Sequence, residues 1–123
     1  MSDQHALATM GIVGPVTSAP EVAEQPRVWL NDWRVIRDGE QNLYLFGLQP
    51  ESTKLRMTTA IQAVDYRKRT WITASGRRYV TGMEPGANLT PELLALAVGM
   101  HGLPGVCIDV TDGVWAEMLR FGH

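Results

Sequence analysis

From residue 33 to residue 81 the chain is a series of short apolar or alternating runs separated by turn-forming residues, and this pattern constrains the fold most strongly. The first two runs, Trp33–Arg37 and Leu43–Phe46, flank a segment that opens with Asp38-Gly39, a common hairpin signal. From residue 55 to residue 63 every odd position is apolar or threonine, which is typical of a strand with one buried face. These runs predict antiparallel β-structure.

Two more strands complete the predicted sheet. The turn residues Tyr66–Lys68 precede the run Thr70–Ala74, and Ser75-Gly76 separates that run from Arg78–Thr81. Because the chain reverses at each turn, consecutive strands should pair with each other in a meander. The sequence therefore predicts about five strands between residues 33 and 81.

Helical signals follow the strands. Thr90 can cap a first helix, Pro91 suits its first position, and Gly99 or Gly102 can end it. Apolar residues at helical spacing between residues 114 and 121 predict a last helix, which Thr111 could cap. Residues 106–110 fit either a strand or the approach to that helix. We therefore predict an α+β fold, with an antiparallel sheet of about five strands followed by one or two helices packed on one face.

Length and composition indicate one folded domain. The 123 residues are 45% hydrophobic and 20% charged, which is close to the globular average. Residues 1–26 show no helical or strand periodicity, so we expect a flexible arm there and a single α+β domain over residues 27–123. The sequence shows neither a membrane span nor a secretory signal, and we expect a cytoplasmic protein.

The charges are distributed unevenly along the chain. Residues 52–82 contain seven Lys and Arg side chains and one acid, Asp65, although the whole chain has a formal net charge of −2. Aromatic residues lie between these bases, and rings beside cations can anchor a protein partner or stack on nucleic-acid bases. The meander would bring both kinds of side chain to one sheet. We predict a partner-binding surface formed by Arg56, Arg67, Lys68, Arg69, Trp71, Arg77, Arg78 and Tyr79.

Three interpretations of this surface stay open. Lys and Arg at strand turns also keep a sheet soluble and prevent its edges from pairing, so the pattern fits a solvated face. A protein partner with an acidic or nucleic-acid-like site fits the enrichment of Arg and Trp in binding surfaces. Nucleic acid fits the local charge but not the acidic chain as a whole. A homo-oligomer is also left open.

The residue types that carry catalysis or metal binding form no recognisable motif. His101, Cys107 and Asp109 lie close in sequence, but their spacing matches no known nucleophile and base pattern. Asp112 adds a fourth polar group without the ligand alternation of a calcium loop. A single cysteine cannot form a disulfide within the chain or a cysteine zinc cage, and no glycine-rich phosphate loop occurs. We expect no catalytic site, no metal site and no cofactor.

One stretch resembles proteins of known context. Residues 58–61 (Thr-Thr-Ala-Ile) and 73–79 (Thr-Ala-Ser-Gly-Arg-Arg-Tyr), with Pro85-Gly86 after them, resemble a segment of small phage and prophage accessory proteins. The resemblance covers under a third of the chain and implies a non-catalytic protein that binds and blocks host machinery, as anti-CRISPR inhibitors do. We therefore expect a non-enzymatic protein-binding module, such as a phage-encoded inhibitor of a host defence complex, with nucleic-acid binding as the alternative.

Overall fold

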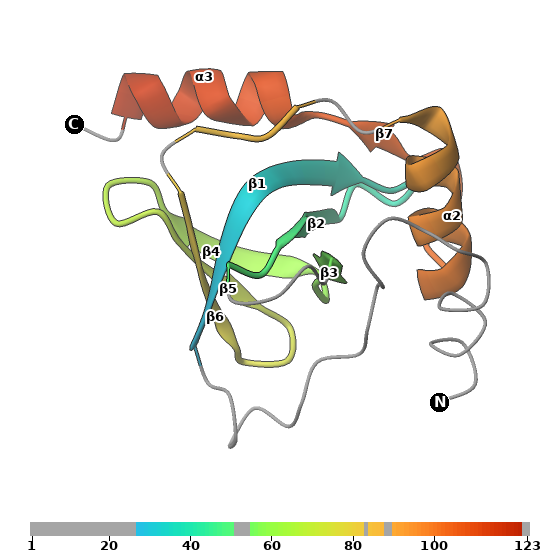
Figure 1. The fold of residues 1–123 in the computed structure, drawn as a ribbon, viewed down its shortest axis with the longest axis horizontal. Helices are drawn as coiled ribbons and strands as arrows, with labels where there is room; N and C mark the ends of the chain where they lie inside the picture. Colours follow the sequence, from blue (N-terminus) through green and yellow to red (C-terminus); the bar gives the residue numbers. More distant parts are fainter. Residues whose placement is uncertain (1–26, 51–54, 83, 88–89, 122–123) are drawn as a thin grey trace.

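The computed structural model describes residues 27–50, 55–82, 84–87 and 90–121 (Figure 1). The arm expected over residues 1–26 lies outside these residues. Nine elements follow one another along the described chain: β1 (Arg27–Arg37), β2 (Leu43–Leu48), β3 (Leu55–Met57), β4 (Ile61–Asp65), β5 (Thr70–Thr73), β6 (Arg78–Thr81), α2 (Pro91–His101), β7 (Ile108–Asp109) and α3 (Thr111–Phe121). The predicted α+β class is confirmed.

The sheet is mixed, whereas we predicted an antiparallel one. Its order is β3-β2-β1-β6-β5-β4, and β7 pairs with β1 beside this path, which makes seven strands among the described residues. All pairs are antiparallel except β1 with β6, where Arg27 lies beside Arg78 and Leu30 beside Thr81. A parallel pair needs a long crossover, and here the crossover consists of four other strands.

Strand β1 belongs to both halves of the sheet because it bends in the middle. Its first residues pair with β6, and its last residues pair with β2 and β7. At the bend Asp32 has a φ of 49°, a left-handed conformation that aspartate tolerates better than most residues. Gly86 lies against this bend so closely that a Cβ on it would come within 2.6 Å of the Asp32 Cα.

The expected strand over residues 55–63 is divided into β3 and β4. Thr58 makes the division, because its backbone N–H donates to the Leu45 carbonyl at 2.9 Å and its Oγ1 accepts from the Leu45 N–H at 3.0 Å. Farther along, the Ala60 carbonyl accepts from Ala74 N–H at 2.8 Å. The chain thus leaves β2 and joins β5 within three residues, which an alternating pattern alone does not reveal.

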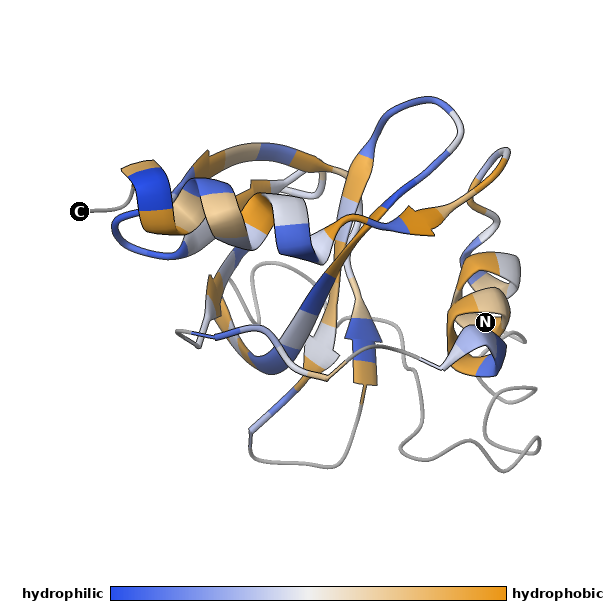
Figure 2. Ribbon diagram, turned by 90° about the horizontal axis from the view of Figure 1, so that it is seen from above, coloured by the Kyte–Doolittle hydropathy of each residue, from blue (hydrophilic) through white to orange (hydrophobic). Residues whose placement is uncertain are grey.

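The two helices pack on opposite faces of the sheet, and not on one face as we predicted. Val35 and Leu45 belong to the hydrophobic cluster that includes Met118 of α3. Ile36 and Phe46 belong to a second cluster with Ala97 of α2. Successive residues of a strand point to opposite faces, so each helix covers a different face. Figure 1 shows α3 along the top of the sheet and α2 at its right side, and Figure 2 shows polar and apolar bands along α3 and a mostly apolar α2.

The ends of α2 follow the sequence closely, whereas Thr111 does not cap α3 as we predicted. The Thr90 hydroxyl accepts from Leu93 N–H at 3.1 Å, and Gly102 ends α2 with a φ of 63°, as expected for these two caps. At α3 the capping oxygen is supplied by Asp109, which accepts from Thr111 N–H at 2.9 Å. The Thr111 hydroxyl accepts instead from Val35 N–H at 2.7 Å. The undecided residues before this helix contain the short strand β7.

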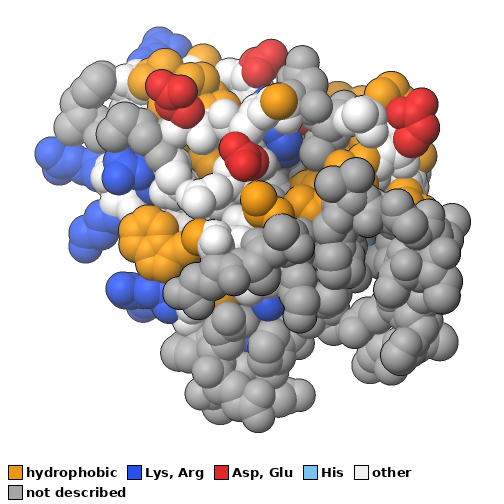
Figure 3. Space-filling model, viewed as in Figure 1, with side chains coloured by type: hydrophobic (Ala, Val, Ile, Leu, Met, Phe, Trp, Pro, Cys, Tyr) orange, Lys and Arg blue, Asp and Glu red, His pale blue; other side chains and the backbone are white. Residues whose placement is uncertain are grey.

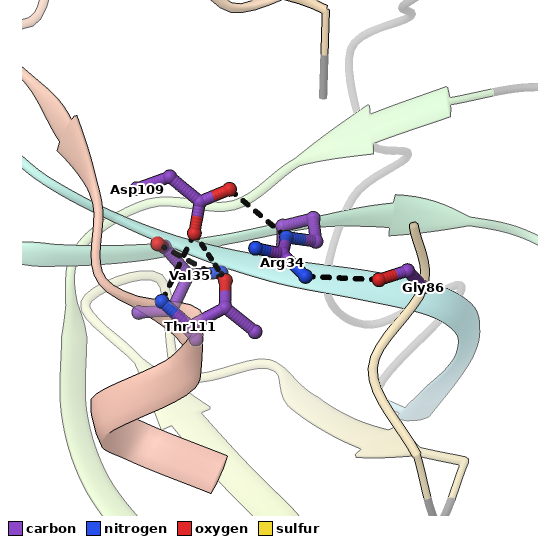
Figure 4. A network of polar contacts seen from close by, with 5 residues as sticks. All are labelled: Arg34, Val35, Gly86, Asp109 and Thr111. Carbon is purple, nitrogen blue, oxygen red and sulfur yellow. Dashed lines mark hydrogen bonds and ion pairs between the residues drawn. The ribbon is translucent and has the colours of Figure 1, made fainter. Parts of the chain in front are cut away.

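A partly buried ion pair ties these parts together (Figure 4). Arg34 in β1 is 5% exposed, and its Nε donates to Asp109 Oδ2 at 2.9 Å while its Nη1 donates to the Gly86 carbonyl at 2.9 Å. Asp109 Oδ1 accepts from both the N–H and the hydroxyl of Thr111. One guanidinium therefore connects the bent strand to β7, to the start of α3 and to the segment after β6.

The carboxylate of this ion pair is held in its charged form. Burial alone would raise the pKa of Asp109, but hydrogen bonds from Arg34 and Thr111 outweigh burial and lower the pKa below its ordinary value of 3.8. A lowered pKa in the folded state stabilises the protein at pH values above the pKa of the unfolded aspartate. That contribution is lost as the pH falls through the lowered pKa.

Replacing Asp109 by Ala should lower the free energy of unfolding by about 3 kcal/mol, because Arg34 stays buried after losing its carboxylate. Urea unfolding at neutral pH measures the change. Asp112→Ala is the matched control, because Asp112 is exposed in the first turn of α3 and should cost less than about 1 kcal/mol. Equal losses in the two variants would show that the ion pair does not hold the fold.

Candidate functional site

One face of the β1-β6-β5-β4 half of the sheet lies away from the cluster packed under α3. Burial alternates along β1, where Val28 and Leu30 are buried while Arg27 and Trp29 are exposed. Since successive side chains change face, the same alternation assigns one set of residues from each neighbouring strand to this outer face. The set consists of Arg27, Trp29, Ala63, Asp65, Thr70, Ile72, Arg78 and Val80.

An open groove of about 310 Å³ lies on this outer face. Four strands and the turn between β4 and β5 contribute to its lining, which consists of Arg27, Ala63, Val64, Asp65, Lys68, Thr70, Ile72 and Arg78. In Figure 3 Lys and Arg side chains gather along the left side of the molecule, over the β4–β5 turn and the adjoining ends of β1 and β6. We call this site the basic groove.

The strand register brings two positive charges together in the basic groove. Arg27 and Arg78 are direct neighbours in the parallel pair of β1 with β6, and both are exposed. Lys68 lines the same groove from the turn, where its backbone N–H donates to Asp65 Oδ1 at 3.3 Å. Within the part of the chain that the structure describes, the side chains of these three bases form no ion pair. Like charges directly opposite each other destabilise a sheet.

The aromatic residues predicted for the binding surface lie in the core. Trp71 is 1% exposed and Tyr79 is 2% exposed. The Trp71 indole N–H donates to Thr81 Oγ1 at 3.0 Å, and its ring lies 5.7 Å from the ring of Trp33. Both residues alternate with outward-facing neighbours in short strands, so they face the interior. The tryptophan at the surface is Trp29, which is 55% exposed beside Arg27.

Two of the predicted arginines are also buried. Arg56 and Arg77 are each 2% exposed and interact with each other electrostatically. Burial lowers the pKa of Arg56, Tyr79 partly offsets this by accepting a hydrogen bond, and the charge of Arg77 lowers the pKa further. These two cations therefore lie inside the molecule and are not part of the basic groove.

The remaining predicted residues surround the turn before β5. Arg67 is exposed there, and Arg69 is half-buried with a φ of 50°. The Arg69 carbonyl accepts from Thr81 N–H at 3.1 Å, which fixes the turn against β6. Of the eight predicted residues, Lys68 and Arg78 line the basic groove. Arg27 was missed because it lies outside the basic stretch of sequence and reaches the groove through the parallel strand pair.

The residues weighed for catalysis have structural surroundings. Asp109 is bound to Arg34 and Thr111, and the Cys107 sulfur lies 3.8 Å from the carbonyls of Pro104 and Gly105. Burial first, and then the charge of Asp38, raise the pKa of the Cys107 thiol, which is the opposite of what a nucleophilic thiolate needs. No three His, Cys, Asp or Glu side chains of the described residues come together as a metal site would require.

No family model, curated protein or solved structure matches this chain. None of the helices in the described ranges is long and apolar enough to span a bilayer.

Arg78→Glu should raise the free energy of unfolding by about 0.5 kcal/mol, because it replaces a repulsive neighbour of Arg27 with an attractive one. Urea unfolding at low salt measures the gain, which should shrink as salt screens the pair. Arg120→Glu changes the net charge equally at the end of α3 and should give no gain. A loss of stability in Arg78→Glu would mean that Arg78 holds the fold together.

Proposed function

We propose that this chain is a non-enzymatic binding module that docks an acidic protein surface on the basic groove. The observation that carries the proposal is the pairing of Arg27 with Arg78 on an exposed sheet face. The fold places the two arginines at directly neighbouring register positions, and an anionic partner would relieve the repulsion between their charges. Lys68 adds a third cation to the same groove.

The side chains beside the charges also suit a protein partner. Trp29 follows Arg27 on the same face of β1 and is more than half exposed. Tryptophan and arginine are the residues that most often carry binding energy in protein interfaces. Ile72 and Ala63 line the groove next to Arg78 and provide apolar area for contact.

A protein partner fits this groove better than nucleic acid does. The groove has three bases and one acid, Asp65, and two buried arginines of the basic stretch do not reach it. Nucleic-acid binders usually neutralise more phosphates, and the whole chain carries a net charge of −2 that would repel a polyanion. Nucleic-acid binding remains the alternative that the experiment below distinguishes.

The resemblance of residues 58–86 to small phage and prophage proteins extends the proposal. An acidic or nucleic-acid-like site on a host defence complex is a suitable partner for a basic groove, and occupying that site would inhibit the complex. In this form of the proposal the chain acts as a stoichiometric inhibitor, since its action requires only binding.

The immobilised chain should retain one protein from a nuclease-treated bacterial extract, and Arg78→Glu should reduce the retained amount at least tenfold. The loss is expected because a carboxylate replaces one of the cations that line the groove. Quantitative mass spectrometry of the retained proteins measures it, and Arg120→Glu is the control with the same net charge. Equal retention by the unchanged chain and the two variants would contradict the proposal. So would a partner that is retained from an untreated extract but lost after nuclease treatment.

A further inference from the structure

We infer that the basic groove recognises an extended peptide in which an apolar side chain separates two acidic ones, in the pattern acid-x-apolar-x-acid. This inference rests on the proposed function and specifies the chemistry of the partner segment. It follows from how the strand register arranges charges and apolar side chains across the outer face.

The register places the groove residues in rows across the strands. One row contains Arg27, Arg78, Ile72 and Ala63, because each of these residues pairs with the next. Adjacent strands lie about 4.8 Å apart, so the two arginines stand at one end of the row and the apolar pair at the other. The next row contains Trp29, Val80, Thr70 and Asp65 in the same order of strands.

Lys68 lies beyond the second row, in the turn that leads into β5. Lys68 and Ile72 are four positions apart in the chain, a backbone span of at most about 13 Å. In an extended peptide, residues i, i+2 and i+4 face the same side and also span about 13 Å. A peptide lying along β5 would therefore place one acid on Arg27 and Arg78 and another on Lys68.

The centre of the groove suits an apolar side chain. Trp29 and Val80 of the second row offer apolar area beside Thr70, whose hydroxyl donates to the Lys68 carbonyl at 3.2 Å. Asp65 pairs with Thr70 in the second row, between the guanidinium groups and Lys68. An acid at the middle position of the peptide would face Asp65 and be repelled. The groove thus selects against a continuous run of acids and against the evenly spaced charges of a nucleic acid.

The test titrates the full chain with blocked peptides and follows backbone amide shifts by NMR. The probes are Glu-Ser-Leu-Ser-Glu, the same peptide with Glu in place of Leu, the peptide with both Glu changed to Lys, and a single-stranded oligonucleotide. The first peptide should shift amides of β5, β6 and the β4–β5 turn. It should bind at least fivefold more tightly than any other probe.

Variants assign the contacts. Arg78→Glu should lower the affinity for the first peptide at least tenfold, whereas Arg120→Glu should leave this affinity unchanged. Asp65→Asn should improve binding of the all-glutamate peptide more than that of the leucine peptide, because it removes the repulsion at the middle position. This change in preference would not arise from a merely structural role of Asp65.

The inference is overturned if the all-glutamate peptide or the oligonucleotide binds more tightly than the leucine peptide. It is also overturned if the amide shifts lie outside the groove. If no peptide binds while Arg78→Glu still abolishes retention of a partner protein, the peptide pattern is wrong and the proposed function stands. If retention is also unaffected by Arg78→Glu, both fail.

Discussion

The ion pair between the buried Arg34 and the half-buried Asp109 fixes the strand on which both halves of the sheet depend. β1 pairs with β6 before its bend and with β2 and β7 after it, so the position of the bend determines how the two halves meet. Arg34 holds the residues after the bend to Asp109 and to the Gly86 carbonyl. Breaking a buried ion pair is costly because a charge stays behind in a poorly solvating environment. The position of Arg27 beside Arg78 is a consequence of that bend.

Local signals in the sequence predicted the local structure. The hairpin of β1 with β2, the strands β5 and β6, and both caps of α2 depend on residues close in sequence, such as Asp38, Thr90 and Gly102. Asp38 accepts hydrogen bonds from Glu40 N–H and Asn42 N–H at 2.8 and 2.9 Å, which explains why its turn was recognisable. The parallel pairing of β1 with β6 joins residues about 50 positions apart, and no pattern within either strand encodes it.

The distinction between local signals and nonlocal strand pairing also explains which residues of the candidate site were predicted. Alternation within a strand separates Arg78 from its neighbours Arg77 and Tyr79, which are buried, but the charge count treats all bases of the stretch alike. A stricter use of the two-residue period would have assigned Tyr79 to the interior. It would not have found Arg27, because that residue joins the groove only through the nonlocal strand pair. The sequence thus identified two of the three bases that line the groove, Lys68 and Arg78.

The central claim is that the parallel β1–β6 pair creates the basic groove, and NMR distance contacts between these strands test it most directly. The account predicts cross-strand contacts in which the residue numbers of both strands increase together, from Val28 with Tyr79 to Leu30 with Thr81. Contacts that run in the opposite direction, or no contact between the two strands, would separate Arg27 from Arg78 and contradict the account.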